Sequence, residues 1–187
     1  MRYQIDALKK WKEIGVNCIL WWAIGVGVGL LFAIAIGSEM QQSLATHLEN
    51  SVSYLLTGDS LPFTYFLRRC LTYAQLILLV WGLEYLNYGF LGVRILLLYR
   101  GFLYGFTQLT WLKAYHLKGI WLALVAYWPH NLLFLLFCAY LEWRLHMRGV
   151  RPLQSKRQIG IILSSAALIL AVTEAYGATA MFRYFFA

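Results

Sequence analysis

The chain has 187 residues, of which 61% are hydrophobic and only 13% are charged, and its formal net charge is +8. A soluble domain carries roughly 25% charged residues, so the composition excludes an ordinary soluble protein. The basic residues lie at the ends of apolar segments rather than in one patch, which argues against a nucleic-acid partner. We therefore expect residues 1–187 to form a single all-α integral membrane domain surrounded by membrane lipids.

The first apolar segment, 14–36, is close to the roughly 20 residues that cross a bilayer core. The basic stretch 1–13 before it predicts either a short helix lying on the inner leaflet or a solvated lead-in. Gly25 and Gly29 have the small-xxx-small spacing that lets another helix backbone approach closely. We therefore predict that these two glycines form a helix-packing face.

Residues 37–69 form the longest polar segment of the chain. Apolar residues recur in it at helical spacing, which predicts an amphipathic helix in the membrane interface after the first span. This helix is the first candidate for a partner surface. The residues of that surface are Leu44, Leu48, Glu49, Val52 and Leu55. The alternative is a helix that only packs on the bundle.

Four more apolar segments predict a bundle of about five transmembrane helices. They are 70–86, 90–112, 119–143 and 159–182. Gly101 and Gly105 repeat the small-residue spacing in the third span. Pro129 lies inside the fourth span, where it removes a backbone donor and clashes with the preceding turn, so we expect this helix to be broken.

The distribution of lysine and arginine predicts the orientation. Basic residues are concentrated before the first span and in the loop 144–157. The N-terminus is therefore expected in the cytoplasm, and five spans then place the C-terminus outside. The predicted location is the cell membrane, with multiple passes.

Polar residues in three predicted spans fall near the middle of the membrane. They are Arg100, His130, Asn131 and Glu174. An isolated charge there costs from about 3 to more than 10 kcal/mol, so we predict an ion pair between Arg100 and Glu174. These four residues and Pro129 form a candidate cluster. It is either a structural ion pair that fixes one packing of the helices or the site of a small transporter or channel.

Nothing in the sequence predicts catalysis, a metal site or a cofactor. We find no serine–histidine–acid order, no paired carboxylates and no HExxH motif. The cysteines Cys18, Cys70 and Cys138 lack metal-ligand spacing. The expected class is a protein that is not an enzyme.

Several short motifs, taken in order, resemble the stage II sporulation protein M family. They are Arg100-Gly101-Phe102, Gly105-Phe106-Thr107, Pro129-His130-Asn131 and Glu174-Ala175-Tyr176. The family's usual proline after the late glutamate is missing, since Gly177-Ala178-Thr179 follows here. The resemblance covers nearly the whole chain.

The resemblance implies a five-span anchor or scaffold in forespore engulfment during sporulation. Its expected partners are the stage II sporulation proteins D and P, which degrade peptidoglycan. In this interpretation the protein supplies recruitment and no chemistry. Association with a second copy of the chain stays open.

Overall fold

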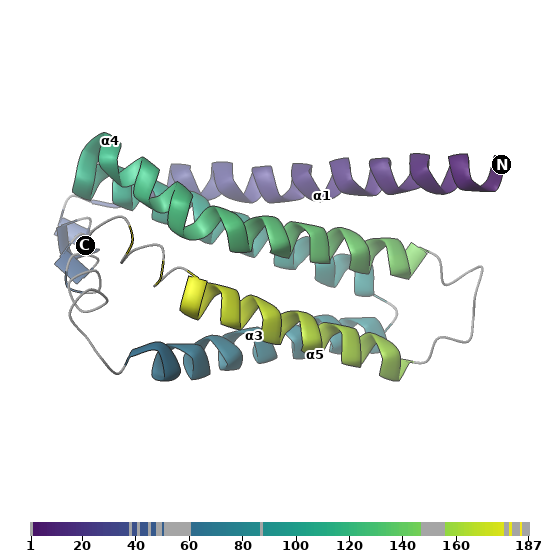
Figure 1. Ribbon diagram of the computed structural model, residues 1–187. Coiled ribbons are helices and arrows are strands. Elements are labelled where there is room, and N and C mark those ends of the chain that lie inside the picture. The colour runs from purple at the N-terminus through teal and green to yellow at the C-terminus, as the bar shows by residue number, and fades with distance from the viewer. Residues whose placement is uncertain are drawn as a thin grey trace.

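The computed structural model describes residues 2–37, 39–40, 42–44, 46–47, 50, 61–86, 88–146, 156–177, 180 and 184. Every regular element of this part is a helix (Figure 1). The elements are α1 (Arg2–Ala35), α3 (Leu61–Tyr85), α4 (Gly89–His146), α5 (Lys156–Val172) and the π-helical turn η2 (Thr173–Gly177). The predicted all-α class is confirmed.

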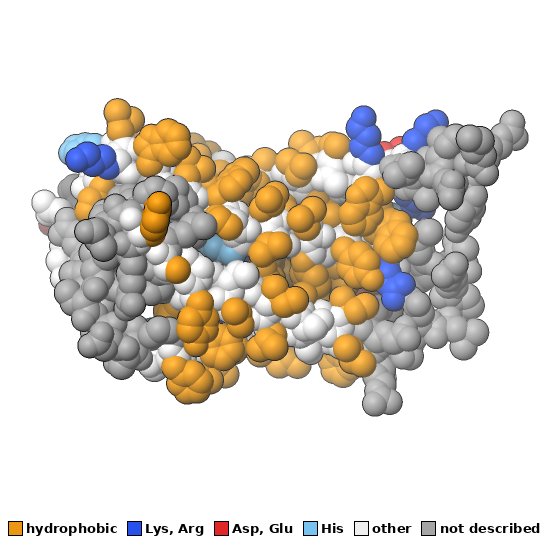
Figure 2. Space-filling view, viewed as in Figure 1, with side chains coloured by type: hydrophobic (Ala, Val, Ile, Leu, Met, Phe, Trp, Pro, Cys, Tyr) orange, Lys and Arg blue, Asp and Glu red, His pale blue; other side chains and the backbone are white. Residues whose placement is uncertain are grey.

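Four helices in the described part are long and apolar enough to cross a membrane. The candidate spans are Lys9–Ala35, Phe63–Glu84, Gly89–Trp121 and Gly160–Gly177. Their exposed apolar side chains cover the middle of the bundle, while lysines and arginines gather toward its ends (Figure 2). This distribution is that of a multi-pass membrane protein, whose hydrocarbon-facing belt is apolar.

Helix α4 folds back on itself near its middle (Figure 1). Arg100 Nε donates to Asn131 Oδ1 at 3.3 Å, although 31 residues of straight helix would span roughly 46 Å. The reversal is at His116, the residue of α4 with non-helical backbone angles. The two arms, 89–115 and 117–146, thus lie side by side. The second arm is about 45 Å long, enough to cross a core of about 30 Å, and it occupies the place of the predicted fourth of five spans.

The backbone of His116 has φ 53° and ψ −142°, a combination that glycine adopts more readily than any other residue. His116→Gly is therefore expected to raise the free energy of unfolding by about 0.5–1 kcal/mol, whereas His116→Val should lower it, because a β-branched residue is strained at positive φ. Thermal unfolding in detergent would measure both changes. If the valine variant were as stable as the glycine variant, the reversal would not depend on this conformation.

The prediction of a broken helix at Pro129 is wrong. Helix α4 continues through Pro129, whose side chain is exposed. A proline removes one backbone hydrogen bond, but neighbouring helices in a membrane bundle can hold the remaining turns in place. The interruption in this part of the chain lies 13 positions earlier, at His116.

The predicted start of the second span at residue 70 is also wrong. Helix α3 begins at Leu61, with Pro62 in its first turn, where the missing N–H has no intrahelical partner to lose. The earlier start moves Arg68 and Arg69 from the end of the predicted polar segment 37–69 into the helix. The lead-in 1–13 likewise belongs to α1, which runs without interruption from Arg2.

Two pairs of glycines bring α1 and the first arm of α4 into backbone contact. A methyl group at Gly25 or Gly29 would overlap the carbonyl oxygen of Leu98 or Phe102, respectively, and one at Gly101 or Gly105 would overlap that of Trp22 or Val26. Residue numbers rise together along the two helices, so they run parallel. All four glycines for which a packing role was predicted lie in this contact.

The predicted partner surface lies mostly outside the described residues, which include neither Leu48, Glu49, Val52 nor Leu55. Leu44 is described as helical and half-buried. It lines a small depression together with Ile36 and Phe106, among others. Leu44 thus packs toward the bundle at the end of α1.

Candidate functional site

Glu174 is the centre of a buried cluster of charged and polar side chains. It lies on η2, directly after α5, and is only 2% exposed. Turns of π-helix are rare in proteins, and those that occur are often found at functional sites. The position of η2 aims the Glu174 carboxylate at three other helical segments.

Both carboxylate oxygens of Glu174 have donors from those segments. Tyr73 of α3 donates its hydroxyl to Oε2 at 2.7 Å, and Arg100 of the first α4 arm donates Nη2 to the same oxygen at 3.4 Å. Arg69 Nη2 lies 3.4 Å from Oε1, and His130 Nε2 of the second arm lies 3.9 Å from it. Helix α3, both arms of α4 and η2 therefore meet at one carboxylate.

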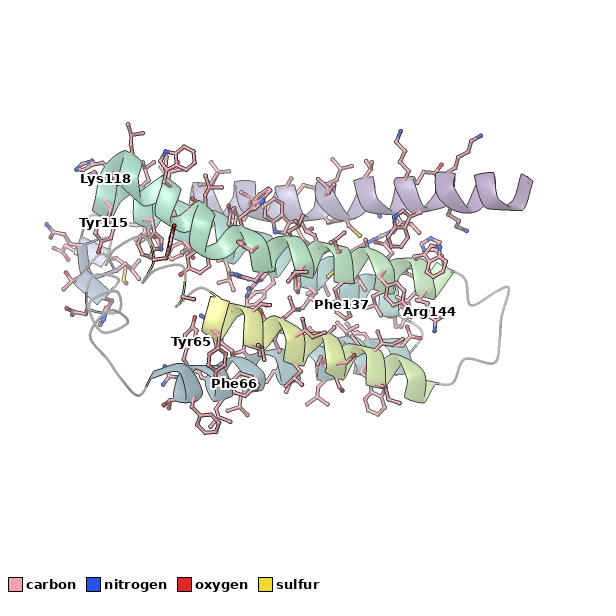
Figure 3. All side chains as sticks on the ribbon, in the orientation of Figure 1. Tyr65, Phe66, Tyr115, Lys118, Phe137 and Arg144 are labelled. Carbon is pink, nitrogen blue, oxygen red and sulfur yellow. The ribbon has the colours of Figure 1, made fainter. Side chains whose placement is uncertain are left out.

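Each arginine of the cluster is held by further contacts. Arg100 donates Nε to Asn131 Oδ1 at 3.3 Å and places its guanidinium 5.7 Å from the ring centres of both Tyr73 and Phe134. Arg69 donates Nη2 to the Tyr65 hydroxyl at 2.6 Å. Tyr65 comes from the first turns of α3 and lies beside the end of α5 (Figure 3). These contacts compensate part of the cost of burying two cations.

The charges of the cluster do not balance. Arg69 and Arg100 contribute two positive charges, and Glu174 contributes one negative charge. With His130 neutral, the cluster carries a net charge of about +1, which is a large local charge in a region of low dielectric constant.

A polar cavity of about 180 Å³ adjoins these side chains and is partly open to the surface of the bundle. One buried water needs roughly 10–15 Å³ of such space, so the cavity is large enough for several waters or a small ion. Its lining consists of Arg69, Arg100, Leu103, Tyr104, Thr107, Tyr127, His130, Asn131 and Glu174.

The structure brings together four of the five residues of the predicted cluster, and the predicted ion pair between Arg100 and Glu174 is present. Pro129 is exposed and does not take part. Arg69 and Tyr73 also belong to the cluster and were not predicted from the sequence. A usable signal was present, because Tyr65, Arg69 and Tyr73 recur every four residues and so lie on one face of a helix.

A second buried polar group, also missed, joins α1 to the end of α4. Glu142 is 1% exposed and accepts from Cys18 Sγ at 3.0 Å and from Asn17 Nδ2 at 3.2 Å. Trp11, about two helical turns before Asn17, packs edge to face on Trp143, the residue after Glu142. This group fixes the contact between the two helices and does not line the cavity beside Glu174.

Comparisons with family models, with curated proteins and with solved structures find no match for the chain. The described residues also contain no group of three or more histidine, cysteine or acidic side chains that could hold a metal ion. The geometry of the cluster therefore carries the functional argument.

Proposed function

We propose that this protein is a non-catalytic membrane scaffold that anchors a peptidoglycan-remodelling complex during forespore engulfment. The observation that carries the proposal is that helix α3, both arms of α4 and η2 meet at Glu174. Its carboxylate oxygens accept hydrogen bonds and ion pairs from side chains of the same chain. Such a cluster favours one arrangement of helices over others. A scaffold needs a fixed arrangement of this kind, because its partners bind to a surface and not to a reacting group.

The partners and the orientation follow from the resemblance and from the charge pattern. The scaffold recruits the stage II sporulation proteins D and P, and the amphipathic segment after α1 presents the binding surface outside the cell membrane. The N-terminus lies in the cytoplasm and the C-terminus outside. The placement of the two termini on opposite sides of the membrane is supported by the fold, because α1 begins at one end of the bundle and α5 ends at the other (Figure 1).

Cysteine labelling tests this orientation. In a background without the three native cysteines, a cysteine at Ser43 is expected to react with a membrane-impermeant maleimide added to intact cells. A cysteine at Gln154, in the basic loop, should react only after the cells are opened. Labelling of position 154 from outside would overturn the orientation.

Co-purification tests the recruitment. The tagged protein, co-expressed with the stage II sporulation proteins D and P and extracted in mild detergent, is expected to retain both. The double substitution Leu48→Asp with Val52→Asp should abolish retention at unchanged abundance. The double substitution Gln42→Asp with Ser43→Asp, which introduces the same two charges at exposed positions, should not. Failure of the unchanged protein to retain either partner would sink the scaffold proposal.

The cavity favours a second candidate function, a small transporter or channel with its site at Arg100, His130, Asn131 and Glu174. Polar groups at membrane depth that line a cavity are typical of transport sites. Purified protein in liposomes would then move a small solute, and His130→Gln would stop the flux at normal abundance. A scaffold predicts no flux and a harmless His130→Gln.

A further inference from the structure

The side chains around the cavity beside Glu174 carry more positive than negative charge. One carboxylate faces two guanidinium groups across a low-dielectric interior. The other buried carboxylates among the described residues, Glu84 and Glu142, lie near the C-terminal ends of α3 and α4 and do not line this cavity. A second negative charge in the cavity would therefore complete the electrostatic balance.

Donors for such a charge are already in place. The Nε of Arg69 is buried and has no hydrogen-bond partner among the described residues. Arginine presents its donors in a planar fork that matches phosphate and carboxylate oxygens. Around it, Tyr104, Tyr127 and Asn131 line the same cavity, and hydroxyl and amide side chains of these types can donate a hydrogen bond.

The cavity lies toward one end of the bundle. Arg69 lies about 12 Å along α3 from its start at Leu61, and Thr107 and Tyr127 lie about 14 Å and 16 Å along their arms from His116. These starting points share one end of the bundle (Figure 1). The Arg69 side chain is 29% exposed, so the arginine is both part of the buried cluster and reachable from outside it.

We infer that this cavity is a binding site for a phosphate group, carried either by free inorganic phosphate or by an anionic lipid headgroup. A tetrahedral oxyanion offers several acceptors to donors that converge from three helical segments. About 180 Å³ admits it with part of its hydration shell. The site stands on this geometry and does not depend on the scaffold role.

Binding is tested on the purified full-length protein with two probes. The first is inorganic phosphate in detergent, measured by calorimetry and by the thermal unfolding midpoint against sodium chloride of equal ionic strength. The second is short-chain phosphatidylglycerol, compared with a neutral diacylglycerol. Saturable binding of at least one phosphate-bearing probe is expected. Phosphate alone would identify a free anion, and phosphatidylglycerol alone a lipid headgroup.

Two variants locate the binding. Arg69→Gln removes the excess charge and leaves the Arg100–Glu174 pair, and it should weaken binding by at least about tenfold. Leu103→Trp fills the cavity without changing a charge and should have the same effect. Leu79→Trp, at an exposed position of α3, is the matched control and should bind normally. The inference is overturned if neither probe binds better than its control, or if both cavity variants bind as tightly as the unchanged protein.

Discussion

Glu174→Gln is expected to lower the free energy of unfolding by about 3–5 kcal/mol, the usual cost of removing one partner from a buried ion pair. The substitution keeps the size of the side chain and leaves Arg69 and Arg100 without a counter-charge in the bundle. Arg100→Leu should cost less, because Arg69 and Tyr73 still hold the carboxylate.

Thermal unfolding in detergent and abundance in membranes measure these effects. Glu13→Gln is the matched control, because it makes the same chemical change at an exposed position of α1 and should change stability by less than about 0.5 kcal/mol. If Glu174→Gln were as mild as this control, the carboxylate would not be the counter-charge of the two arginines.

Gly29→Ala is expected to destabilise the protein by about 1–3 kcal/mol, the range found when a packed interior is overfilled. The new methyl group would overlap the backbone of Phe102, and backbone cannot move aside as a side chain can. The two parallel helices would have to separate and lose contacts along their length.

The same helix supplies the control. A methyl group at Gly27 would meet nothing within 4 Å, so Gly27→Ala should be neutral or slightly stabilising, as alanine favours helix more than glycine does. Gly101→Ala should behave like Gly29→Ala, since it overlaps the backbone of Trp22. Equal unfolding midpoints for the variants at 27 and 29 would contradict close contact between α1 and α4.

The features predicted correctly from sequence are those in which the type of one residue is enough to say what it needs from its surroundings. Gly25, Gly29, Gly101 and Gly105 are useful in a membrane helix chiefly where a backbone approaches. Arg100 and Glu174 each need a partner because lipid cannot solvate them. These requirements hold in any packing arrangement, so one sequence is enough to recognise them.

The features predicted wrongly depend on what surrounds a residue in three dimensions. Pro129 breaks an isolated helix, but the packed bundle carries α4 through it. The prediction places Arg69 in the polar segment 37–69 outside the spans, whereas in the structure it pairs with Glu174 of η2 inside the bundle. The reversal at His116, by contrast, falls in the short connection that the predicted spans 90–112 and 119–143 leave between them.

The central claim is that the cluster at Glu174 acts as one interaction that holds the bundle together. A double-mutant cycle on Arg100 and Glu174, measured as free energies of unfolding in detergent, tests it most directly. We predict that Arg100→Leu combined with Glu174→Gln costs less than the sum of the two single substitutions, by at least about 1 kcal/mol, because the double variant removes one of the two cations left uncompensated by Glu174→Gln. Additive costs within about 0.5 kcal/mol would contradict the claim.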